Sequence, residues 1–164
     1  MLRFAIVLFS LLALPARANL GETVEQCVIR YGRPVGFSEA SPKFPFGTVE
    51  FSATGYTLVI FVAKDKELGA RVSKTDKSAF SDTEMQNILT ADSGATPWTS
   101  LPSKDPTCLQ WTRGDKASVL YDKTNHVLIF TSDEMTRTLH STAANPTAAS
   151  PAQANPPTTN SATP

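Results

Sequence analysis

The sequence carries no excess charge of either sign. It contains 15 lysine and arginine side chains and 15 aspartate and glutamate side chains. Nucleic-acid binding requires a basic face, and no run of like charges supplies one. Removal of Arg3 and Arg17, argued below, would leave a small acidic excess. We therefore expect no nucleic-acid partner.

Motifs of common catalytic and cofactor sites are also missing. The chain has no Gly-x-Ser-x-Gly elbow, no phosphate-binding loop and no dinucleotide fingerprint. Its two histidines, His126 and His140, have no cysteine, histidine or carboxylate at metal-ligand spacing. The carboxylate pairs in 82–84 and 133–134 fall in first turns of predicted helices, where negative charge favours the helix dipole. We predict no cofactor and no metal, and favour a non-catalytic protein. A small exported hydrolase with a dispersed site and a structural envelope protein are the alternatives.

Long apolar segments are absent as well. The apolar run at 4–14 is shorter than the ~20 residues of a membrane-spanning helix, and no later segment qualifies, so we expect no membrane span. Arg3 precedes this run and an Ala-x-Ala pattern at 16–18 follows it, which is typical of a secretory signal peptide. We predict cleavage between Ala18 and Asn19. The mature chain would then be secreted or periplasmic, and the residue directly after the cleavage site is not a cysteine that could carry a lipid.

The last 24 positions lack the side chains that a folded core needs. Residues 141–164 contain no charged, aromatic or large aliphatic side chain. Such a segment has nothing to bury against the entropy cost of ordering it. We predict a disordered Ala/Thr/Pro-rich tail at 141–164 and a single folded domain at 19–140.

Three segments of the domain have helix signals. In the first, Val24, Cys27, Val28 and Tyr31 share one face at helical spacing. Capping residues precede it at 23–26, and a glycine and a proline at 32–34 stop it. A second helix follows the capping box at 81–84, with a buried stripe of Met85, Ile88 and Leu89. A short third helix begins near Ser132.

Between the helices the apolar period changes to two, which indicates strands. The segment 46–63 predicts two strands joined at Thr54-Gly55, and 68–75 predicts a third. The segment 108–132 predicts three more. The predicted element order is αβββαβββ with a possible terminal helix. Short connections favour an antiparallel sheet with helices packed on one face, so the fold class is α+β.

The opening of the domain resembles known exported domains. Gly21-x-Thr23-x-x-Gln26-Cys27, then Tyr31-Gly32-x-Pro34 and the strand "YTLVIFV", are similar to the pattern of SmpA/OmlA-type domains. The β-lactamase-inhibitory-protein fold is built of similar units. The "LGET…C…YG-P" opening also resembles uncharacterised secreted proteins of planctomycete-type bacteria. The resemblance implies a protein-interaction domain whose partner is another protein or an envelope component. This chain lacks the lipidated cysteine of the outer-membrane lipoproteins.

Cysteine is scarce. Cys27 and Cys108 are an even count in an exported chain, which invites a disulfide. However, Cys27 shares the buried stripe of the first helix, whereas Cys108 alternates with Leu109 and Trp111. If those two side chains point to the core, Cys108 points away from it. A disulfide needs Cα atoms within ~7 Å. The sequence leaves both states open, and the alternation favours free thiols.

Tryptophan is scarce too. Trp111 alternates with Leu109, which favours a core position. Trp98 lies in the Pro-rich loop at 93–106, and aromatic side chains are enriched at interfaces. We predict Trp98 as a candidate partner surface.

Overall fold

The computed structural model describes residues 19–94 and 96–144 of the 164-residue chain. The predicted signal peptide at 1–18 and residues 145–164 of the predicted tail lie outside this range. The described elements in chain order are α1 (Val24–Tyr31), β1 (Gly36–Ser38), β2 (Gly47–Ala53), β3 (Tyr56–Ala63), β4 (Lys66–Lys74), α2 (Asp82–Asp92), β5 (Thr99–Leu101), β6 (Cys108–Thr112), β7 (Ser118–Asp122), β8 (Val127–Thr131) and α3 (Asp133–Ala144).

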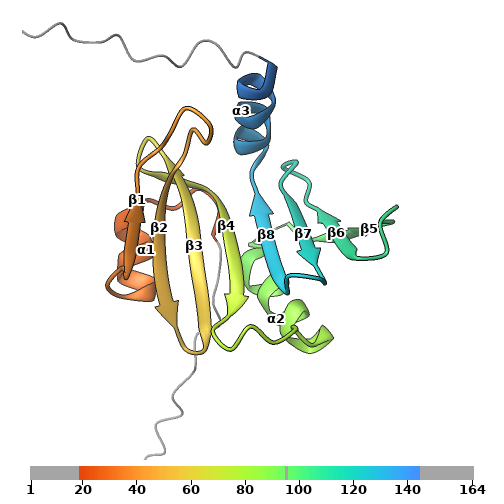
Figure 1. Ribbon diagram of the computed structural model, residues 1–164. Helices are drawn as coiled ribbons and strands as arrows, with labels where there is room; N and C mark the ends of the chain where they lie inside the picture. Colours follow the sequence, from red (N-terminus) through yellow and green to blue (C-terminus); the bar gives the residue numbers. More distant parts are fainter. Residues whose placement is uncertain (1–18, 95, 145–164) are drawn as a thin grey trace, which may run out of the picture.

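The strands form one antiparallel sheet in the order β1-β2-β3-β4-β8-β7-β6-β5. Each half of the chain is a helix followed by a four-stranded meander. The last strands of the halves, β4 and β8, pair at the centre of the sheet (Figure 1). The α+β class is confirmed, and the predicted element order matches apart from two added short strands.

The helices α1 and α2 begin at the capping residues that the sequence predicts. Thr23 and Gln26 make both bonds of a capping box at the start of α1, and Gly32 ends that helix with a φ of 84°. Ser81 and Glu84 make the same reciprocal box at the start of α2. Each box satisfies two backbone N–H groups that lack an intrahelical partner.

Side-chain alternation places the main core between the sheet and the first two helices. In β3, Leu58 and Ile60 are fully buried and alternate with residues on the opposite face. In β8, Leu128 and Phe130 do the same. The helices add Cys27, Met85, Ile88 and Leu89 to this cluster, and β2, β4, β6 and β7 contribute further buried side chains. α1 and α2 therefore cover one face of the sheet.

The third helix departs from the prediction that all helices pack on one face. α3 begins directly after β8 and extends beyond the end of the sheet (Figure 1). Its Met135 packs with Phe46 and Leu68 in a separate small cluster, with Phe61 at its edge. Phe61 follows the core residue Ile60 and so points to the opposite face. The helix also continues to Ala144, so residues 141–144 of the predicted tail are helical.

Two edge strands, β1 and β5, were not predicted. Each has three residues, too few to show a period of two, and neither contains a buried side chain. β1 follows the Pro34 stop signal, and β5 lies inside the segment predicted as a Pro-rich loop. None of the helices in the described part of the chain combines the length and apolarity needed to cross a membrane.

A close contact at Gly69 joins α3 to the sheet. A Cβ atom at this position would meet the Met135 sulfur and would lie 2.6 Å from the Phe130 carbonyl oxygen. A side chain is therefore excluded by both a neighbouring helix and the paired strand.

We expect Gly69→Ala to destabilise the domain by about 1–3 kcal/mol, the usual effect of overpacking. Chemical denaturation monitored by circular dichroism measures this change. Gly47→Ala is the control, because a Cβ there would lie at ordinary contact distance, 3.4 Å from the Ser38 carbonyl oxygen. Equal stability of the two variants would contradict the proposed contact.

Candidate functional site

Exposed apolar side chains gather around α1 and β1. Six large apolar residues of the described chain are exposed, and four of them lie between positions 28 and 37. They are Val28 at 37% exposure, Ile29 at 79%, Val35 at 64% and Phe37 at 71%. We call these four residues the α1–β1 patch.

The patch is formed by one helix and the sheet edge beside it. α1 packs against β2, and Figure 1 shows it behind β1 and β2. Phe37 pairs with the core residue Val49, so its side chain points to the face that α1 covers. No further strand shields it, because β1 is the last strand of the sheet. Exposed charged residues lie near the patch in the sequence, including Glu25, Arg33 and Glu39.

This patch corrects part of the predicted helix face. Cys27 is fully buried and Val24 and Tyr31 are half-buried, but Val28 is exposed. The signal in the sequence was Ile29, an apolar residue outside the predicted buried stripe. A short helix at the margin of the sheet buries only part of the apolar face that its sequence contains.

Beneath α1, a cysteine and a glutamate share a closed environment. The Cys27 thiol donates to Glu67 Oε2 at 3.4 Å, and Glu67 has no exposed surface. Burial, and then the nearby Glu67, raise the pKa of Cys27 to about 12. Burial also raises the pKa of Glu67 well above its usual range. Nucleophilic cysteine chemistry needs a thiolate, so this thiol is a packing group.

A polar groove separates the start of α1 from the end of α2. It has a volume of about 520 Å³ and is open to solvent. Its polar wall is formed by Asn19, Glu22, Gln26, Asp92, Arg113 and Asp115.

Arg113 organises one side of this groove. Its Nη1 donates to the Asp92 carbonyl oxygen at 2.8 Å and to Asp92 Oδ2 at 3.1 Å. Its Nη2 donates to Asp115 Oδ2 at 2.8 Å. The guanidinium carbon also lies 4.8 Å from the centre of the Trp98 ring, a favourable cation–π geometry. Arg113 thus binds the last residue of α2 and connects this helix to the β6–β7 turn.

Asp92 is the most perturbed carboxylate of this wall. Its side chain is buried, and burial raises its pKa to about 7 although Arg113 lowers it. On the other side, Glu22 pairs with Arg30 and accepts from Asn19 Nδ2 at 2.9 Å. Sequence reasoning missed Glu67, Asp92 and Arg113, because no motif marks a charged residue that becomes buried only when separate elements meet.

The structure does not bring the two cysteines and Trp98 together in one site. Both cysteines are free. Trp111 is buried in the core and Cys108 lies on the other side of β6, as the alternation favours. Trp98 is half-buried between Arg113 and Phe130, so only part of its ring faces solvent. Of the two residues at the predicted cleavage site, Asn19 lies at the groove and Ala18 is outside the described range.

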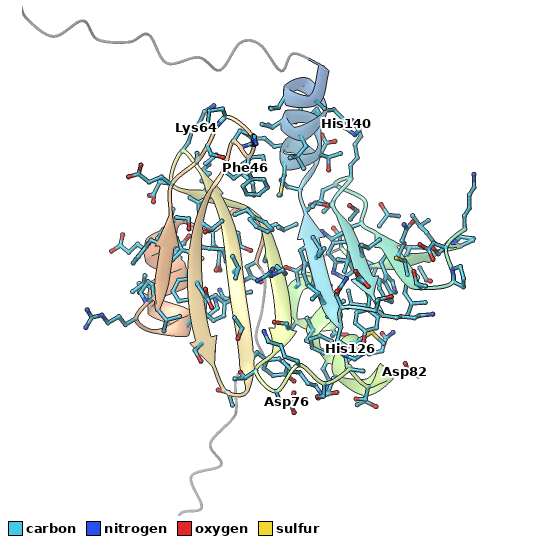
Figure 2. The ribbon with its side chains drawn as sticks, in the orientation of Figure 1. Phe46, Lys64, Asp76, Asp82, His126 and His140 are labelled. Atoms are coloured by element: carbon cyan, nitrogen blue, oxygen red, sulfur yellow. The ribbon has the colours of Figure 1, made fainter. Side chains whose placement is uncertain are left out.

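The histidines and helix-start carboxylates form no common site. Figure 2 shows His126 and Asp82 toward one end of the molecule and His140 on α3 at the other. His126 Nδ1 lies 2.9 Å from the Lys77 carbonyl oxygen, a contact between two turns. Within residues 19–94 and 96–144, no group of three His, Cys, Asp or Glu side chains could hold a metal ion.

The fold and its surfaces define an α+β domain of two helix-plus-meander halves. No family model matches this chain, and neither does a curated protein. A cysteine-rich secretory protein from Staphylococcus aureus has a similar solved structure, with a TM-score of 0.43 and 12% sequence identity. The match covers 71% of this chain and 45% of that one, so the chain spans less than half the length of that protein.

Proposed function

We propose that this chain is an exported, non-catalytic interaction domain that binds another protein through the α1–β1 patch. The observation that carries the proposal is the gathering of four exposed apolar side chains within ten residues. Contiguous exposed apolar surface bordered by polar residues is characteristic of protein contact sites. The resemblance of residues 21–34 to exported interaction domains supports the same reading.

The patch specifies the chemistry of its partner. Ile29 and Phe37 offer aliphatic and aromatic surface, so the partner presents apolar side chains at the centre of the contact. Arg33 and Glu39 lie near the patch in the sequence with opposite charges, so the partner rim carries both signs. Rim charges contribute orientation and association rate more than affinity.

Site-specific photo-cross-linking tests the proposal. A photoreactive amino acid at Ile29 of the exported chain is expected to capture a defined protein in an envelope fraction. The same amino acid at Asn87, an exposed position on α2, is the matched control and is expected to capture none. Equal cross-linking from both positions would overturn the proposal.

The captured partner then allows an affinity test. Ile29→Lys and Phe37→Lys are each expected to weaken binding by at least about tenfold, because central apolar contacts carry most of the binding energy. Both side chains are largely exposed, so the melting temperature should change little. Asn87→Lys is the control. Unchanged affinity in both patch variants would exclude this surface.

A further inference from the structure

The polar groove is short of positive charge. Three carboxylates face it or its edge, those of Glu22, Asp92 and Asp115. Glu22 pairs with Arg30, while Asp92 and Asp115 share Arg113. Three carboxylates therefore share two guanidinium groups. The nearby Glu67, which is buried, is a further carboxyl group and not a cation.

Two carboxylate oxygens in this groove have no hydrogen-bond partner. They are Glu22 Oε2 and Asp92 Oδ1, and both atoms are buried; the Trp98 indole N–H, which lies beside the Asp92 carboxylate, is also unpaired. Asp92 is only 3% exposed. An unsatisfied buried polar atom is costly, more so when it is charged. Burial raises the pKa of Asp92 to about 7, although Arg113 lowers it, and a further cation beside this carboxylate would favour its ionised form.

The backbone at Asn19 runs along the same wall. Its side chain donates to Glu22 Oε1 at 2.9 Å. The backbone N–H of the next residue, Leu20, lies against the Asp92 carboxylate and lowers its pKa. The backbone nitrogen of Asn19 therefore belongs to a residue whose side chain contacts Glu22 and whose neighbour contacts Asp92.

We propose that the groove is a binding site for an ammonium group, and that its occupant is the α-ammonium of Asn19. Cleavage between Ala18 and Asn19 converts a neutral amide nitrogen into this ammonium. The new charge balances the groove and supplies donors for the free oxygens of Glu22 and Asp92. Removal of the signal peptide thus completes the fold. The inference rests on the exported state in the proposed function, but not on the partner or the α1–β1 patch.

Two readouts test the proposal on chain 19–164. Acetylation of Asn19 removes the charge, and we expect it to lower the melting temperature by at least about 4 °C at pH 6.5. In the free chain, NMR titration should give the α-amine a pKa at least one unit above its ordinary range of roughly 7.7–8.0. A chain that begins at Ala18 moves the amine by about 3.8 Å and should lose most of the gain.

Variants identify the groove as the cause. Glu22→Gln and Asp92→Asn should each reduce the difference between free and acetylated chains, whereas Asp82→Asn, on the exposed start of α2, should preserve it. The NMR titration of the α-amine uses the unmodified chain, so it tests the proposal even if a variant fails to fold. An ordinary amine pKa together with equal melting temperatures would overturn the proposal. N-terminal sequencing that places the start of the exported chain elsewhere than Asn19 would also overturn it, without affecting binding through Ile29.

Discussion

Phe130→Ala is expected to lower the free energy of unfolding by about 3–5 kcal/mol, the range for truncating a buried phenylalanine. Phe130 is fully buried on β8, where the two halves of the sheet meet. It pairs with Ala70 of β4 and contacts the edge of Trp98. The small residue opposite cannot fill the cavity left by the ring. Urea denaturation monitored by circular dichroism measures the loss.

The adjacent residue provides the matched control. Ile129 lies on the same strand, points to the opposite face and is half-buried. Ile129→Ala should cost less than half as much as Phe130→Ala, because solvent replaces part of the lost contacts. Equal losses would show that the two faces of β8 are packed alike, contrary to the structure.

Raising the pH is expected to destabilise a chain whose Asn19 amine is acetylated. In the unfolded chain Asp92 ionises near its ordinary pKa of 3.8, whereas in the folded domain burial raises this pKa to about 7. Between these values the unfolded chain has released a proton that the folded domain retains, so stability falls as pH rises. This interval corresponds to on the order of 4 kcal/mol. The raised pKa of Glu67 acts in the same direction.

Denaturation between pH 4.5 and pH 8 measures this effect. The lower limit avoids the opposite contribution of Glu84, whose pKa is lowered to about 2 mainly by its hydrogen bond to Lys74, so that it destabilises only in acid. Asp92→Asn should make the profile less steep, since the amide does not titrate, and the slope that remains is the contribution of Glu67. A profile that is already flat in the acetylated parent chain would show that Asp92 ionises normally in the folded domain.

The elements that could be predicted are those with local causes. The capping boxes at Thr23 and Ser81 begin two helices because their bonds join residues three apart. The turn at Thr54-Gly55 separates β2 from β3 because both residues adopt positive φ. Alternation located Trp111 in the core and Cys108 on the other face. Each signal is read within a few residues.

The candidate surfaces were less predictable. Helical spacing assigned Val28 to the buried stripe, but a helix near the sheet margin has no neighbour to cover that side, so Val28 is exposed. Trp98 is half-buried, with Arg113 and Phe130 beside its ring, and a partner surface there stays a prediction. The exposure of both side chains depends on which distant parts of the chain pack beside them, so neighbouring residues in the sequence do not reveal it.

The sequence by itself determined the α+β class, the order of the main elements and the two helix starts, because hydrogen bonds between near neighbours and side-chain alternation establish them. Tertiary structure alone decided the β4–β8 pairing, the position of Met135 over Gly69 and the meeting of Glu22, Asp92 and Arg113 at one groove. Burial and charge balance depend on every element packed around a side chain. They are therefore properties of the assembled fold, and no short segment of the sequence contains them.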